Sequence, residues 1–219
     1  MGNLKKDTIL FDLDGTLINT NELIIESFLH TLHHYYPNQY GREDVIPFIG
    51  PPLVDSFKSI DKDRYKEMVE MYREHNVAHH DALVKEFEGV FETVAHLQDE
   101  GYHLAVVTTK MRPTVHMGLN LTKLDQFFDV VVTYNDVQNV KPHPEPLYKA
   151  LTQLGSSKER AIMVGDSQYD ILAGKNAGVT TIGVGYSIKG REFIEKQKPD
   201  FIIDTMPELI DVAKRLKEE

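Results

Sequence analysis

The chain has 219 residues, a formal net charge of −10 and no cysteine, which excludes disulfides, thiolate metal sites and cysteine nucleophiles. The negative charge argues against a large nucleic-acid interface, which needs a basic surface, and no run approaches the ~18 apolar residues of a membrane helix. We therefore expect a cytoplasmic protein that binds neither nucleic acid nor membrane, and in which any metal is held by oxygen or imidazole.

Six short apolar runs rich in Val and Ile alternate with helix-like stretches, a pattern typical of a parallel sheet built from β-α-β units. In chain order the runs are Thr8 to Leu13, His103 to Thr108, Phe128 to Thr133, Ala161 to Val164, Thr180 to Val184 and Phe201 to Ile203. The helices predicted around the later runs are Val90 to Glu100, Pro113 to Leu121, Pro144 to Leu154, Tyr169 to Ala177, Lys189 to Lys196 and Met206 to Lys217. The sequence therefore predicts an α/β fold.

The segment between the first two runs differs from the rest, because from about Leu17 to Val84 it contains no convincing strand. We expect helices there near Glu22 to Tyr36, Leu53 to Ile60 and Asp63 to His80. A long insertion of this kind between two strands predicts a helical cap. Residues 1–16 and 85–219 are accordingly expected to form the core, and residues 17–84 the cap.

Two carboxylates, Asp12 and Asp14, follow the first run. They are two residues apart, so in an extended chain their side chains project the same way, and Gly15 allows a sharp turn after them. Ligands of open parallel sheets bind at the carboxyl ends of the strands, which is where this pair lies. An Asp at a turn can also simply accept local hydrogen bonds, and the pair alone leaves that alternative open.

Polar residues follow other runs as well. Thr108, Thr109 and Lys110 come after the second run, and Asp166 comes after the fourth. Asp170 lies one helical turn beyond Asp166, so both carboxylates can face one point. Four carboxylates at one edge of a sheet raise each other's pKa unless a cation lies among them, and oxygen ligands alone suit Mg²⁺. The sequence therefore predicts a magnesium site.

Lys141 is followed by three prolines within the segment Asn139 to Pro146, which fix the backbone around it. An isolated lysine is usually a solvated surface group. This rigid setting, between the third run and the next helix, favours a phosphate or carboxylate as a positioned partner of Lys141.

Together these residues resemble the haloacid dehalogenase superfamily of phosphohydrolases, whose four motifs match in order and spacing. Asp12 to Thr16 matches Asp-x-Asp-Gly-Thr, and Leu104 to Thr108 matches an apolar strand that ends in Thr or Ser. Lys141 matches the third motif, and Gly165 to Asp170 matches Gly-Asp-x-x-x-Asp. The resemblance covers essentially the whole chain and implies a Rossmann-like parallel sheet core with an inserted α-helical cap of the family's first type, C1.

The resemblance implies catalytic roles that agree with the chemistry of these side chains. Asp12 would be the nucleophile that forms an aspartyl-phosphate, and Asp14 the general acid and base. Thr108 would hold phosphoryl oxygens, with Thr109 as the alternative hydroxyl, while Lys141 would compensate the charge of the transition state.

The resemblance also implies the metal set. Mg²⁺ would be held by the Asp12 carboxylate, the backbone carbonyl of Asp14 and the Asp166 carboxylate. Asp170 would bind it through a water or support the direct ligands.

The chain is more similar still to the pyrophosphatase branch of this superfamily, a neighbour of the phosphoglycolate phosphatases. The segments that carry this likeness are Asn21 to Ile25, Ser27 to Leu32, His34 to Pro37, Pro47 to Pro51, Val107 to Lys110 and Ile188 to Glu192. Pyrophosphate is small and highly charged, so its distal phosphate needs further cations, for which Lys110 and Arg42 are candidates. We therefore expect a small phosphorylated substrate, namely pyrophosphate, with a phosphoglycolate-type phosphomonoester as the alternative.

Other interpretations stay open. Histidines in the predicted cap include pairs four residues apart, which can bind zinc or simply pack between helices. They are His30, His33, His34, His75, His79 and His80. A noncatalytic, phosphate-responsive module of the same fold would be expected to lack the nucleophile, the acid or the lysine, all of which are present. No coiled coil or long apolar surface stretch is visible, so we expect a monomer.

Overall fold

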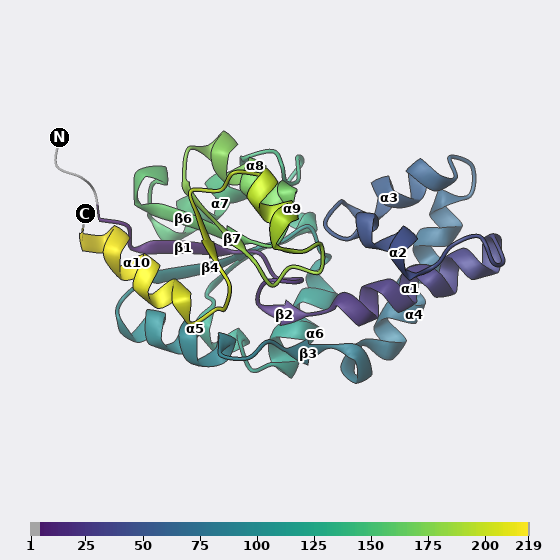
Figure 1. Ribbon diagram of the computed structural model, residues 1–219, viewed down its shortest axis with the longest axis horizontal. Helices are drawn as coiled ribbons and strands as arrows, with labels where there is room; N and C mark the ends of the chain where they lie inside the picture. The colour runs from purple at the N-terminus through teal and green to yellow at the C-terminus, as the bar shows by residue number, and fades with distance from the viewer. Residues whose placement is uncertain (1–4, 219) are drawn as a thin grey trace.

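In the computed structural model, which describes residues 5–218, an α/β core and a group of helices lie at opposite ends of the molecule (Figure 1). The first and last described residues lie at the end of the core that is remote from these helices (Figure 1). Among the described residues no helix combines the length and the apolar character that crossing a bilayer requires. The predicted monomer and cytoplasmic location stay predictions.

Within residues 5–218 the core contains a six-stranded sheet, in the order β5-β4-β1-β6-β7-β8, whose neighbouring strands are all parallel. The strands are β1 Thr8–Phe11, β4 His103–Val107, β5 Val130–Val132, β6 Ala161–Gly165, β7 Thr180–Val184 and β8 Phe201–Ile203. Each lies within a predicted run or exceeds it by one residue, so these six predictions are confirmed. The runs are nearly continuous in apolar residues because helices cover both faces of the sheet.

Two hydrophobic clusters fill the core, one on each face of the sheet. Ile9 and Phe11 of β1 belong to the first cluster and Leu10 to the second, as the alternation of a strand requires. The first cluster is covered by α5 Val90–Asp99, α6 Arg112–Leu121 and α10 Glu208–Glu218. The second is covered by α7 Glu145–Leu154 and α8 Gln168–Ala177, while α9 Arg191–Lys196 packs beside β7. The predicted helices are thus confirmed, with bounds that shift by a turn or less.

The inserted segment contains α1 Asn21–Tyr35, α2 Arg42–Val45, α3 Leu53–Ile60 and α4 Tyr65–Leu83. These helices enclose a hydrophobic cluster of their own around Phe28, Phe57 and Met68. The predicted bounds of core and cap stay a prediction, and residues 1–4 and 219 lie outside the described part of the chain. Short 3-10 turns complete the chain at Ile46–Phe48, Asp125–Phe127, Tyr134–Asp136 and Lys158–Arg160.

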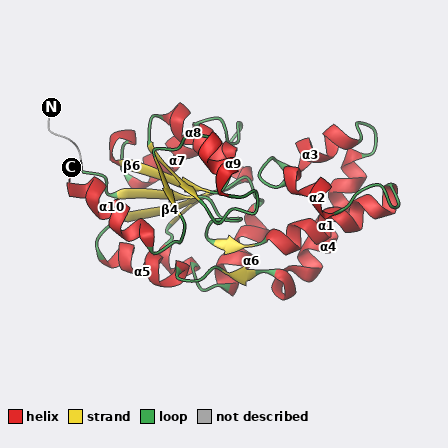
Figure 2. Cartoon of the chain, viewed as in Figure 1, coloured by secondary structure: helices red, strands yellow, loops and turns green. Residues whose placement is uncertain are grey.

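The expectation that residues 17–84 contain no strand is wrong at one point. Strand β2 Ile18–Asn19 pairs antiparallel with β3 Lys85–Glu86, and the ribbon lies between core and cap (Figure 2). Strands of two residues are too short to show a period, so only the meeting of the two connecting segments reveals them. The four-residue helix α2 escapes sequence reasoning for the same reason.

Candidate active site

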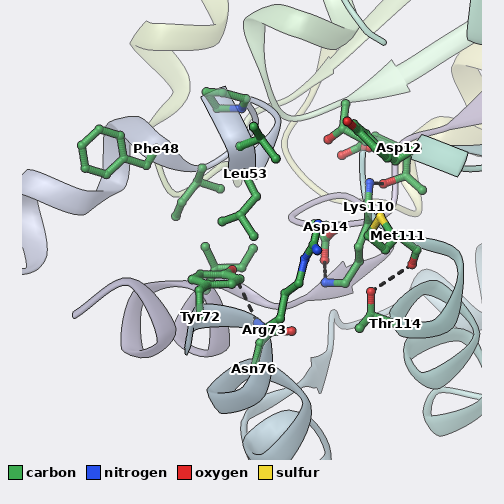
Figure 3. Close-up of a pocket in the computed structure, with 18 of the residues that line it drawn as sticks. Asp12, Asp14, Phe48, Leu53, Tyr72, Arg73, Asn76, Lys110, Met111 and Thr114 are labelled. Carbon is green, nitrogen blue, oxygen red and sulfur yellow. Dashed lines mark hydrogen bonds and ion pairs between the residues drawn. The ribbon is translucent and has the colours of Figure 1, made fainter. Parts of the chain in front are cut away.

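The predicted polar residues meet at one edge of the sheet. Asp12 and Asp14 follow β1, Thr108 follows β4, and Asp166 follows β6. Because β1 lies between β4 and β6, these three strand ends are neighbours. They border a pocket of about 290 Å³ between core and cap, whose lining includes Asp12, Asp14 and Thr108 (Figure 3).

Lys141 also lines this pocket, although it is only 3% exposed. Its Nζ donates hydrogen bonds to Asp12 Oδ1 at 2.7 Å, to Asp170 Oδ1 at 2.6 Å and to the Val107 carbonyl at 2.8 Å. Burial lowers the pKa of a lysine, but the two carboxylates outweigh it and hold the pKa of Lys141 above its ordinary value. The carboxylate partner predicted for this lysine is therefore confirmed.

Asp12, Asp166 and Asp170 form a buried carboxylate cluster, with oxygen atoms within 4.8 Å of one another. Burial, and then the charge of Asp170, raise the pKa of Asp12 to about 7 in spite of Lys141. Burial and Asp12 raise the pKa of Asp166 well above its ordinary value. Among the described residues Asp166 accepts only a long hydrogen bond, at 3.4 Å from Ser187 Oγ. Lys141 contacts two of the three carboxylates, and Lys189 lowers the pKa of Asp166 from a greater distance, so the carboxylates outnumber the nearby lysines. This oxygen-rich, negative cluster fits a divalent cation.

Asp170 belongs to the carboxylate cluster and also caps helix α8. Its Oδ2 accepts hydrogen bonds from the Ser167 amide at 3.0 Å and the Ser167 hydroxyl at 2.6 Å, which caps the first turn of α8. Its Oδ1 receives the Lys141 ammonium. Both oxygens therefore have partners, and the carboxylate fixes the lysine to the start of the helix.

Asp14 stands apart from the cluster. Its Oδ1 accepts a hydrogen bond from Lys110 Nζ at 2.7 Å (Figure 3). The chain turns at Gly15 with a φ of +81°, where a Cβ atom would lie 2.4 Å from Asp166 Oδ2. Only glycine fits this turn, which brings the backbone against the Asp166 carboxylate.

The two threonines after β4 differ in their bonding. Thr108 is 4% exposed, and its hydroxyl oxygen accepts a hydrogen bond from the Lys110 amide at 3.1 Å. That contact leaves the hydroxyl hydrogen free to donate into the pocket. The Thr108 amide itself is used by the Val132 carbonyl in the sheet. Thr109 and Lys110 also line the pocket.

Two of the three arginines in residues 17–84, Arg42 and Arg73, lie in different surroundings. Arg42 forms a paired contact with Glu22 at the surface, and the pocket lining does not include it. Arg73 of α4 does line the pocket, and its side chain points toward Asp14 and Lys110 (Figure 3). Sequence reasoning missed Arg73, because its place depends on which face of a long helix turns toward the core.

The cap loop at Gly50 is packed onto the core. Gly50 has a φ of +106°, and a Cβ atom there would lie 3.3 Å from Ser167 Cβ. Lys189 Nζ donates a hydrogen bond to the neighbouring Ile49 carbonyl at 2.6 Å. Gly50 and Pro51 therefore line the pocket from the cap side.

Three of the six cap histidines, His30, His75 and His79, pack against one another. The rings of His30 and His75 stack with centroids 4.4 Å apart, and those of His75 and His79 with centroids 4.0 Å apart. Within residues 5–218, the spacing that metal ligands need occurs at the carboxylate cluster and at no histidine group. The packing interpretation therefore holds, and the described structure gives no support to a zinc site.

Comparison with known proteins agrees with the fold and the motifs. The model of the haloacid dehalogenase-like hydrolase family matches residues 9–184. A relative in Bacillus cereus (strain AH820), named Pyrophosphatase PpaX, is 59% identical over 209 residues, which cover 95% of this chain and 97% of the relative. A relative of the same name in Anoxybacillus flavithermus is 61% identical over 206 residues, with coverage of 94% and 96%.

Solved structures are similar over the same length. The crystal structure of a predicted phosphoglycolate phosphatase from Haemophilus somnus has a TM-score of 0.85 and 27% identity, and the match covers 97% of this chain and 99% of that one. A predicted phosphatase from Clostridium acetobutylicum has a TM-score of 0.85 and 26% identity, with coverage of 99% and 100%. In both structures the match therefore covers the core and the cap of this chain.

Proposed function

The chain belongs to the haloacid dehalogenase-like hydrolases, and on that premise we propose that it is a Mg²⁺-dependent phosphohydrolase that hydrolyses inorganic pyrophosphate through an aspartyl-phosphate on Asp12. The observation that carries the chemistry is the buried contact between Asp12 and Lys141 at the border of the pocket. The choice of pyrophosphate is supported by relatives of about 59% identity that are named for that activity.

In the first step, Asp12 attacks a phosphorus atom of the substrate. A bond forms between an Asp12 carboxylate oxygen and phosphorus, and the bond between phosphorus and the bridging oxygen breaks. Asp14 gives its proton to the departing phosphate, and Lys110, bonded to the Asp14 carboxylate, keeps that side chain turned toward the pocket. Lys141 offsets the charge that reaches Asp12 and the phosphoryl oxygens.

In the second step, water attacks the phosphorus of the aspartyl-phosphate. Asp14 now takes the proton of that water, phosphate leaves, and the Asp12 carboxylate is restored. The Thr108 hydroxyl donates to a phosphoryl oxygen in both steps, because its own acceptor position is occupied by the Lys110 amide. Thr109 completes this wall of the pocket.

The carboxylate cluster supports Mg²⁺ as the cation. Asp12 and Asp166 would hold the ion with the Asp14 backbone carbonyl, while Asp170, whose oxygens already serve Lys141 and Ser167, would act at most through water. When bound, the ion would reduce the repulsion between the nucleophilic carboxylate and an anionic substrate.

The distal phosphate of pyrophosphate meets two cations. Lys110 and Arg73 both line the pocket beside Asp14. We expect Arg73→Met to lower kcat/KM on pyrophosphate by about tenfold. A charge-assisted hydrogen bond is worth about 1.5–3 kcal/mol, and because the Arg73 side chain is exposed we take the lower end of that range. On ethyl phosphate, which lacks a second phosphate, the effect should be smaller.

Steady-state kinetics of both substrates checks this prediction, and Arg42→Met is the matched control. Arg42 is a cap arginine outside the pocket lining, so its substitution should change neither value by more than about twofold. Equal losses in the two variants would show that Arg73 contributes only general positive charge.

A substrate panel tests the proposed function itself. Phosphate release should require Mg²⁺ and stop when a chelator is added. Among the substrates of the panel, pyrophosphate should have the highest kcat/KM. The second candidate is phosphoglycolate, which the Haemophilus somnus structure of similar fold favours by its description. Turnover of phosphoglycolate well above that of pyrophosphate would replace the substrate and leave the role of Asp12 unaffected.

A further inference from the structure

The pocket has two chemically different ends. Toward the core it presents Asp12, Lys110 and Lys141. On the cap side it is lined by a set of apolar and aromatic side chains, which we call the apolar chamber: Phe48, Leu53, Val54, Tyr72, Val77 and, from the core, Met111. Phe48 and Leu53 lie across the pocket from Asp12, with Arg73 between them (Figure 3).

The pocket is larger than pyrophosphate requires. Its volume is about 290 Å³, whereas the cavity volume needed to hold one water molecule is roughly 10–15 Å³. The nine non-hydrogen atoms of pyrophosphate would then need roughly 90–135 Å³. When pyrophosphate is bound near Asp12, about half to two thirds of the pocket volume is left for water.

Apart from Arg73 and Asn76, the cap side of the pocket is lined by apolar and aromatic side chains, which suit apolar groups. Val77 is 49% exposed, and Phe48 and Leu53 are partly exposed although they pack on the hydrophobic cluster of the cap. Apolar surface that faces a pocket gains when an apolar ligand displaces its water, by roughly fourfold in affinity for each buried methylene group. Helix α4 contributes both a charged and an apolar residue to the cap side, because Arg73 and Val77 lie one turn apart on it.

We propose that the site also hydrolyses phosphomonoesters of apolar alcohols, with the phosphoryl group at Asp12 and the leaving group in the apolar chamber. The Asp12 carboxylate forms a bond to phosphorus, the bond from phosphorus to the alcohol oxygen breaks, and Asp14 protonates that oxygen. Water then releases phosphate and restores Asp12. The inference rests on the proposed chemistry of Asp12 and is independent of the choice of pyrophosphate.

A series of ethyl, butyl and hexyl phosphate tests the inference with the intact enzyme and Mg²⁺. Hexyl phosphate carries four methylene groups more than ethyl phosphate, so partial burial should raise kcat/KM by at least about tenfold from one to the other. A smaller ratio overturns the inference.

A matched pair of variants locates the effect. Leu53→Gln keeps the size of a partly buried side chain in the apolar chamber but removes its apolar character, so the hexyl to ethyl ratio should fall by at least about threefold. Leu121→Gln makes the same change at the end of α6, where Leu121 is 39% exposed and outside the pocket lining, and should keep the ratio of the unmodified enzyme. An unchanged ratio in Leu53→Gln would overturn the placement of the leaving group.

Pyrophosphate measured in the same experiment separates the two proposals. If pyrophosphate is hydrolysed and alkyl phosphates show no dependence on chain length, this inference fails and the proposed function stands. If alkyl phosphates show the dependence and pyrophosphate is not hydrolysed, the proposed substrate fails and this inference stands. If neither is hydrolysed, both fail.

Discussion

Asp12→Asn removes phosphate release, and we expect kcat on pyrophosphate to fall by at least about 10³-fold. An amide oxygen can still accept the Lys141 hydrogen bond, so the local geometry should persist. What is lost is the nucleophile, without which no aspartyl-phosphate forms. Steady-state phosphate release with Mg²⁺ measures the effect, and activity within about tenfold of the unmodified enzyme would remove Asp12 from the mechanism.

The same substitution should stabilise the metal-free protein at alkaline pH. The pKa of Asp12 is about 7 in the folded chain, above the ordinary value of 3.8, mainly because the carboxyl is buried. The folded state therefore holds the proton more tightly than the unfolded state, and stability is lost as the pH rises from about 4 through about 7. Asparagine cannot ionise, so Tm with chelator at pH 8 should be higher in Asp12→Asn. A lower Tm would attribute the lost activity to damaged folding.

Lys141→Met should damage both activity and stability. It leaves Asp12 and Asp170 buried without their shared cation, and removal of one partner of a buried ion pair costs about 3–5 kcal/mol. The stability deficit should shrink as the pH falls, because the two carboxyls can then take up protons. Activity should fall by at least about 10²-fold, since charge compensation at Asp12 is lost.

Chemical unfolding and phosphate release at several pH values test this prediction, with Lys214→Met as the matched control. Lys214 is an exposed residue of α10, and its loss should cost less than about 0.5 kcal/mol with no change in activity. A deficit in Lys141→Met that stays constant with pH would mean that the lysine is merely a packing element.

The fold and the central site were largely predictable because they depend on strong local patterns. The strands are buried on both faces, so their Val and Ile runs stand out, and the carboxyl ends of parallel strands gather whatever follows them. That rule alone brought Asp12, Thr108 and Asp166 together. The resemblance to the haloacid dehalogenase superfamily and its pyrophosphatase branch is confirmed by the family match and the named relatives.

What escaped prediction depends on contacts between distant segments. The β2 and β3 ribbon exists only because two connecting segments run side by side between core and cap. Arg42 and Arg73 look alike in sequence, yet one pairs with Glu22 at the surface and the other enters the pocket. The hydrogen bonds that Asp170 accepts from both Ser167 and Lys141 could not be predicted either. They depend on where Lys141 lies, and Lys141 belongs to a separate segment between β5 and α7.

Trapping the phosphorylated enzyme tests the central claim most directly. Acid quenching during turnover of pyrophosphate with Mg²⁺, followed by peptide mass spectrometry, should find a phosphate on the peptide that contains Asp12, and the Asp12→Asn enzyme should carry none. Rapid turnover with no phosphorylated peptide, or with the phosphate on a residue other than Asp12, would contradict the account.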